Sequence, residues 1–161
     1  LLIGMTGGHG NSMILGNFDS TFAAHPEMAL YIPLIGGTGG NVGTQSSALV
    51  VQGLANSSLD AKNTFKQVSK EAVVALINAT IISLLVYTYN FIRFGATATV
   101  TYSVSISLFS VVMFASIFGT LVPMTLEKMK IDPAIATGPF IAITNDIIGM
   151  MMYMGITVLL S

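Results

Sequence analysis

The stretch PFIAITNDIIGMMMYMG, Pro139 to Gly155, contains a single formal charge, Asp146, among apolar residues and glycines. A carboxylate near the centre of a bilayer costs about 2.5–3.5 kcal/mol on insertion scales. Such residues face the interior of a helix bundle or water, and they commonly mark ion pathways. Asp146 lies near the middle of an apolar block long enough to cross a bilayer. Its position therefore predicts a functional group buried in a membrane protein.

The composition of the whole chain supports this interpretation. The 161 residues are 53% hydrophobic and 8% charged, with a mean hydropathy of +0.79, whereas soluble domains carry about 25% charged residues. The net charge of −1, without a basic cluster, argues against a nucleic-acid partner. The absence of cysteine excludes disulfides and thiolate metal sites. We therefore expect an all-α integral membrane protein embedded in a lipid bilayer.

Hydrophilic breaks divide the chain into five candidate transmembrane helices within a single transmembrane domain, residues 1–161. A helix needs roughly 20 mostly apolar residues to cross a bilayer, so the first block is marginal. The predicted spans are 1–18, 31–55, 72–92, 100–126 and 133–160.

The distribution of basic residues predicts the orientation of these spans. With the N-terminus inside, five of the six basic residues lie in cytoplasmic loops, and only Arg93 lies outside. Those five are Lys62, Lys66, Lys70, Lys128 and Lys130. The excess of cytoplasmic Lys and Arg favours a protein of the cell (inner or plasma) membrane with its N-terminus cytoplasmic and its C-terminus outside.

The second span, PLIGGTGGNVGTQSSALVVQG from Pro33 to Gly53, is rich in glycine and uncharged polar residues. Overlapping GxxxG pairs between Gly36 and Gly43 let membrane helices approach closely, although each glycine costs about 1 kcal/mol in a soluble helix. Asn41, Thr44 and Gln45 follow directly. Tight packing with interhelical amide hydrogen bonds is one interpretation. The lining of a pore is favoured, because many uncharged oxygen atoms lie at the same depth.

The charge that compensates Asp146 is expected to be a proton or a mobile cation, since no Lys, Arg or His lies mid-span in the second to fifth spans. A protonated Asp146 bonded to a neighbouring helix remains an alternative. The candidate ligands are the side chains of Asp146, Asn145, Asn41 and Gln45 with the carbonyl of Ala142. Such oxygen ligands suit Mg²⁺, and equally Mn²⁺, Co²⁺ or Ca²⁺, but suit zinc and copper poorly.

Two polar residues of the first span, His9 and Asn11, have no assigned role. His9 is expected either to be hydrogen-bonded in the interior or to form a proton-sensitive part of the path. Both interpretations stay open at the level of the sequence.

Two motifs resemble the MgtE magnesium transporter family. PLIGGTGGNVGTQSSALVVQGLA is similar to its second transmembrane helix, and IDPAIATGPFIAITNDIIG to its last. The resemblance covers essentially the whole chain and implies a homodimer of five-helix domains with a pore on the two-fold axis. It also implies cytosolic regulatory domains in a full-length protein, including a CBS pair that senses Mg²⁺. Residues 1–161 contain none of these domains.

The same resemblance assigns roles to individual residues. Asp146 matches the pore aspartate, and Ala142, Asn145 and Gly149 surround it on the last helix. Asn41 and the glycine turn before it, which includes Gly37, match the lining contributed by the second span. With Thr44 and Gln45, these residues form the predicted metal site.

Three functions compete at this stage. The leading hypothesis is a divalent-cation channel or transporter, most simply for Mg²⁺, and not an enzyme. The second is a membrane anchor or scaffold, which predicts polar residues scattered through the membrane rather than converging. The third, an intramembrane aspartyl hydrolase, is disfavoured, because such an enzyme uses two carboxylates that share a proton. The chain has one intramembrane aspartate and no GxGD stretch.

Overall fold

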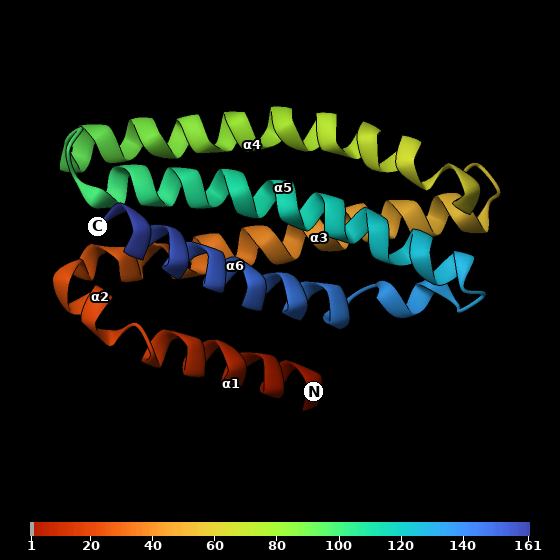
Figure 1. Cartoon of the computed structure of the whole chain (residues 1–161), viewed down its shortest axis with the longest axis horizontal. Coiled ribbons are helices and arrows are strands. Elements are labelled where there is room, and N and C mark those ends of the chain that lie inside the picture. The colour runs from red at the N-terminus through yellow and green to blue at the C-terminus, as the bar shows by residue number, and fades with distance from the viewer. Residues whose placement is uncertain (1) are drawn as a thin grey trace.

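The computed structural model describes residues 2–161, which are helical and include no strand (Figure 1). The predicted all-α class is therefore confirmed. The first predicted span begins at Leu1, which lies outside the described residues. In chain order the elements are α1 (Leu2–Gly16), α2 (Asp19–Ala24), the 3₁₀ helix η1 (Pro26–Tyr31), α3 (Ile32–Ala55), the 3₁₀ helix η2 (Ala61–Asn63), α4 (Thr64–Phe94), α5 (Thr99–Lys128), the 3₁₀ helix η3 (Pro133–Ala136) and α6 (Pro139–Leu160).

Local chemistry determines where α6 begins. The carboxylate of Asp132 accepts a hydrogen bond from the backbone N–H of Ala134 at 2.9 Å and so caps η3. Gly138 then adopts a φ of 62°, a conformation that glycine reaches without steric cost. Pro139 occupies the first turn of α6, where its missing N–H has no consequence. The fifth predicted span is therefore divided into η3, a sharp turn and α6.

The long helices form a bundle with α5 at its centre (Figure 1). α4 lies along one side of α5, and α3 and α6 pack against the rest of it. α1 packs mainly along α6 at the edge of the bundle. α4 turns Ala75 and Ala79 toward the interior and exposes many Val, Ile and Leu side chains. An apolar exterior of this kind is compatible with lipid rather than water.

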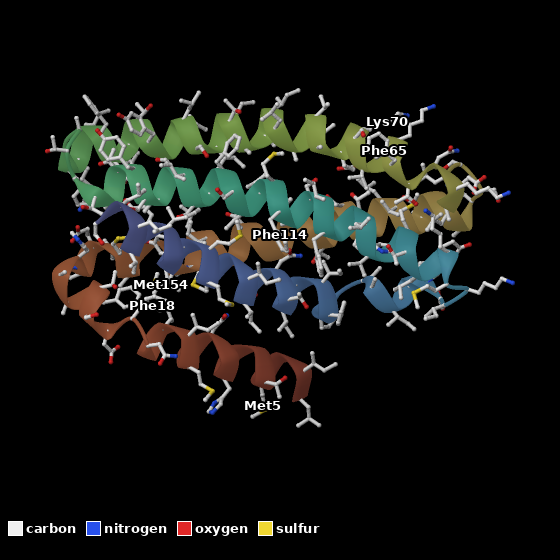
Figure 2. The ribbon with its side chains drawn as sticks, in the orientation of Figure 1. Met5, Phe18, Phe65, Lys70, Phe114 and Met154 are labelled. Atoms are coloured by element: carbon white, nitrogen blue, oxygen red, sulfur yellow. The ribbon has the colours of Figure 1, made fainter. Side chains whose placement is uncertain are left out.

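A hydrophobic core closes the end of the bundle where η1 crosses it. Met28 and Tyr31 of η1 pack there with residues of α3, α5 and α6, and Phe18 packs against the same cluster near Met154 (Figure 2). The hydroxyl of Tyr153 donates to the Met28 carbonyl at 2.8 Å, and the Tyr31 hydroxyl donates to the side chain of Asn90. These bonds satisfy the polar ends of two buried aromatic residues and hold η1 in place.

Three helices of the described residues are long and apolar enough to cross a membrane: Ala61–Phe94, α5 and α6. The predicted spans 72–92 and 100–126 lie within the first two. α1 has 15 residues, which is short of the roughly 20 that a bilayer requires. α3 has 24 residues, but its glycines and amides lower its hydropathy. Three of the five predicted spans therefore have bilayer character by length and composition, and the five-span topology stays a prediction.

The closest approach between α3 and α5 is at Gly43 and Gly119. A Cβ atom at Gly119 would lie 2.5 Å from the Gly43 carbonyl oxygen. Because that oxygen belongs to the backbone of a packed helix, it cannot move aside as the end of a flexible side chain can. Glycine at position 119 therefore sets the distance between the two helices.

We expect Gly119→Ala to lower the stability of the protein by about 1–3 kcal/mol, the usual cost of overpacking. The measurement is the midpoint of thermal unfolding in detergent. Gly155→Ala is the matched control, because a Cβ at Gly155 has no neighbouring atom within 4 Å. The control should leave the midpoint unchanged or raise it, since alanine favours helix. Equal midpoints for the two variants would contradict the close approach.

Candidate functional site

The site is built where α6 crosses α3, around the carboxylate of Asp146. A Cβ atom at Gly40 of α3 would lie 2.6 Å from Asp146 Oδ1 and 3.5 Å from the carbonyl oxygen of Ala142. Gly40 therefore leaves room for the carboxylate, which any larger residue would displace. Thr44, one turn further along α3, donates its hydroxyl to the Gly40 carbonyl at 2.8 Å. The glycine run thus brings an acidic oxygen and a backbone carbonyl to the same point.

Two oxygen atoms in this region have no hydrogen-bond partner. Asp146 Oδ1 and Asn145 Oδ1 are both buried, and neither accepts a hydrogen bond from the described residues. Buried polar groups in native proteins nearly always have a partner, and leaving one without costs about 1–3 kcal/mol. The arrangement therefore calls for a ligand such as water or a cation.

The side chain of Asn145 is held in one orientation. Its amide Nδ2 donates to the carbonyl of Ile141 at 2.9 Å. The same nitrogen occupies the space that a Cβ at Gly43 would fill. The buried amide fixes the register between α3 and α6.

The outward face of α3 carries a polar stripe that consists of Gly37, Asn41 and Gln45. All three are exposed, and their spacing of four residues aligns them on one side of the helix. Exposed amides on a helix at membrane depth are tolerated only against protein or in a water-filled cavity. The stripe is therefore a polar face of α3 that the described residues leave uncovered.

The predicted site residues fall into three groups. Asp146 and Ala142 meet at Gly40, and Thr44 bonds to the carbonyl of that glycine. Gly37, Asn41 and Gln45 form the polar stripe. Asn145 and Gly149 make helix contacts: a Cβ at Gly149 would lie 3.4 Å from the side chain of Val111 and 4.0 Å from the carbonyl of Ile35. Gly149 thus has a packing role, and metal binding by any of the eight residues stays a prediction.

Sequence reasoning missed Val111 of α5. Its side chain is buried and contacts both Gly39 of α3 and Gly149 of α6, so it packs between the two helices at the level of the site. A valine within an apolar span carries no signal that distinguishes it from its neighbours.

The first helix, α1, contributes packing contacts with α6, and it does not place His9 in the interior of the described chain. Gly7 and Gly10 of α1 face the side chains of Ile143 and Ile147 of α6. His9 projects from an exposed part of α1, so the interior interpretation of this residue is wrong for the described chain. Asn11 Oδ1 is buried without a partner among the described residues.

The fold and the site define an all-helical protein with bilayer-length apolar helices and one acidic side chain at a glycine-lined helix crossing. No group of three or more His, Cys, Asp or Glu side chains gathers within residues 2–161. The model of the MgtE family, described as a divalent cation transporter, matches residues 32–156. The chain belongs to this family, and the sequence resemblance is thereby confirmed.

Three curated relatives carry the name "Magnesium transporter MgtE". The protein of Bacillus subtilis is 32% identical over 156 residues, 97% of this chain and 34% of its own length. The protein of Thermus thermophilus is 32% identical over 149 residues, 92% of this chain and 33% of its own length. The protein of Enterococcus faecalis is 28% identical over 159 residues, 97% of this chain and 33% of its own length. The chain therefore spans about a third of the length of these relatives.

We expect Gly43 and Asn145 to be energetically coupled. Gly43→Ala should destabilise the protein by about 1–3 kcal/mol by displacing the Asn145 amide. In an Asn145→Ala background the same change should cost less, giving a coupling energy of about 0.5–3 kcal/mol in a double-mutant cycle of thermal unfolding. Gly155→Ala combined with Asn145→Ala is the control and should be additive. Additivity at Gly43 would refute the contact.

Proposed function

We propose that this chain is the membrane-spanning part of a divalent-cation transporter that moves Mg²⁺ past Asp146. In this proposal two copies, each with five spans, form a homodimer with the pore on the two-fold axis. The observation that carries the proposal is the carboxylate oxygen of Asp146, which is buried beside Gly40 without a hydrogen-bond partner. A cation supplies the missing partner.

Symmetry makes the carboxylate tolerable without a basic side chain. Two ionised Asp146 residues about 8 Å apart repel each other by about 2 kcal/mol at an effective dielectric constant of 20. A divalent cation between them replaces this repulsion by attraction to both. A two-fold axis provides the second carboxylate from the same sequence.

The polar stripe on α3 supports the same dimer. Gly37, Asn41 and Gln45 are exposed in one chain, and the proposed five-span topology puts them at membrane depth. Facing the equivalent stripe of a second copy across water, they form the wall of a hydrated path and satisfy their amides. In this proposal the stripe and the Asp146 carboxylate line the same path, whereas the scaffold hypothesis predicts no shared path.

The ligand chemistry and the relatives together favour Mg²⁺. Mg²⁺ releases water reluctantly and is typically bound through one or two carboxylates while it keeps several waters. A site with one carboxylate per chain, amide oxygens and the carbonyl of Ala142 suits that behaviour. The relatives are named as magnesium transporters. Mn²⁺, Co²⁺ and Ca²⁺ are the competitors to include in any transport assay.

The remaining features follow from the basic residues and from the length of the relatives. The lysines around the start of α4 and the end of α5 favour a cytoplasmic N-terminus and an outside C-terminus in the cell membrane. The relatives are about three times as long as the aligned region. We propose that a full-length protein carries cytosolic regulatory domains in addition to residues 1–161.

Asp146→Asn should reduce Mg²⁺ flux into proteoliposomes by tenfold or more, because the loss of a charge facing a cation removes several kcal/mol at an effective dielectric constant of about 20. The variant should still elute as a folded dimer. Asp19→Asn, which alters an exposed carboxylate in α2, is the control and should transport normally. Wild-type flux in a well-folded Asp146→Asn protein would refute the assignment.

Gly40→Ala should raise the Mg²⁺ concentration needed for half-maximal flux, because the new Cβ pushes Asp146 Oδ1 out of its place. We expect an increase of about tenfold, which corresponds to 1.4 kcal/mol. Gly155→Ala on α6 lies outside the predicted site and has open space for its Cβ, so its half-maximal concentration should change much less. Equal effects of the two substitutions would argue against a carboxylate positioned by Gly40.

A further inference from the structure

A second carboxylate, Glu71 near the start of α4, takes part in a hydrogen-bond chain that the proposed pore does not use. Ser116 Oγ of α5 lies 3.3 Å from Glu71 Oε2, and Ser46 Oγ of α3 lies 3.2 Å from Ser116 Oγ. Both serines are almost fully buried, with 3% and 6% of their surface exposed. The chain therefore links the outermost helix, α4, through α5 to the helix that carries the polar stripe.

The Glu71 carboxylate determines which group donates at each step of this series of hydrogen bonds. An ionised carboxylate accepts hydrogen bonds and donates none. Ser116 therefore donates to Glu71, and Ser46 donates to the oxygen of Ser116. A serine in a helix often bonds instead to the carbonyl four residues earlier, as Ser105 does with Thr101. Glu71 holds the two hydroxyls in the interhelical arrangement.

Glu71 has no competing ion pair among residues 2–161. The neighbouring Lys70 extends away from the bundle (Figure 2), whereas Glu71 reaches α5. Hydrogen bonds to a charged group contribute more than those between neutral groups. The Ser116 hydroxyl is thus the hydrogen-bond partner of Glu71 among the described residues, and Ser46 is linked to Glu71 only through Ser116.

This series of hydrogen bonds ends at Ser46, one helical turn from the candidate site. Ser46 follows Gly43 by three residues, and Ser116 precedes Gly119 by three residues. Gly43 and Gly119 form the close backbone contact between α3 and α5, and Gly43 also accommodates the Asn145 amide. A bond between Ser46 and Ser116 therefore holds the two helices together immediately beside the place where α3 receives Asn145 and Asp146.

We propose that Glu71 is a positioning residue that, through Ser116 and Ser46, holds α3 against α5 and thereby fixes the place of the Asp146 carboxylate. This inference rests on the proposed cation transport. Glu71 contacts no transported ion in this arrangement and acts only through the two hydroxyls. Loss of the Glu71 carboxylate lets the C-terminal half of α3 move away from α5 and weakens the cation site.

The test compares substitutions that remove the hydrogen bond with one that keeps it. In proteoliposomes, Glu71→Ala and Ser116→Ala should each raise the Mg²⁺ concentration for half-maximal flux by about five- to tenfold, the order expected for the net contribution of one hydrogen bond. Glu71→Gln should recover most of the wild-type value, because its amide oxygen still accepts from Ser116. The double variant Glu71→Ala/Ser116→Ala should be no worse than either single variant.

Matched controls lie close by in the chain. Glu127→Gln alters an exposed carboxylate at the end of α5, and Ser69→Ala removes an exposed hydroxyl that bonds only to the Phe65 carbonyl of its own helix. Both should leave the half-maximal concentration unchanged. A Glu71→Gln protein as defective as Glu71→Ala, or additive effects in the double variant, would overturn the proposal. So would a Glu71→Ala protein that melts earlier but keeps the wild-type half-maximal concentration.

A second measurement separates this inference from the proposed function. Backbone hydrogen exchange should become faster in α3 around Gly43 in Glu71→Ala and return to the wild-type rate in Glu71→Gln. This readout involves no transport. Absence of divalent flux in the wild-type protein would refute the proposed function while leaving the exchange comparison intact. Unchanged exchange in Glu71→Ala would refute the positioning role whatever the flux.

Discussion

The contact on which the structure depends is the close approach of α3 to its neighbours at glycine. Gly40 leaves space for the Asp146 carboxylate, Gly43 leaves space for the Asn145 amide, and Gly119 lets α5 reach the Gly43 carbonyl. In lipid the hydrophobic effect does not drive helices together, so association depends on van der Waals packing and interhelical hydrogen bonds. The substitution of any of these glycines would therefore alter both the packing of the bundle and the position of the acidic group.

This constraint explains why one helix is so polar. α4 exposes many apolar side chains and turns small residues such as Ala75 and Ala79 toward the bundle, as expected of a helix that faces lipid. α3 also packs closely against its neighbours through its glycines, but it exposes Asn41 and Gln45 on the face away from those contacts. A helix with one face closed by glycine contacts and the other open and polar is suited to a boundary between protein and water. The same features lower its hydropathy below that of the three most apolar helices.

The sequence predicted the helical class and the importance of Asp146 and the glycine run, because an isolated charge and a GxxxG pattern are local signals. Single-sequence reasoning could not find Val111, whose role depends on three helices meeting, or the division of residues 133–160 into η3 and α6. The turn at Gly138 depends on a positive φ that an apolar run conceals. The exposed position of His9 could not be predicted either, because its place on α1 depends on which face the glycines turn toward α6. Sequence patterns identify the functional residue types along one helix, whereas the contacts between helices become known only from the folded structure.

One end of the bundle and its middle are held by different interactions, and this difference bears on how the site is kept in place. At the end, Tyr31 and Tyr153 hold η1 over a core of large apolar side chains. Near the middle of α3 and α5, the hydroxyls of Ser46 and Ser116 connect the two helices beside the close contact of Gly43 and Gly119. Hydrogen bonds between buried groups add to the rigidity of the segments that they join. The acidic group lies between a closed apolar end and this hydroxyl-linked segment, so the geometry around it is most sensitive to changes on the hydroxyl side.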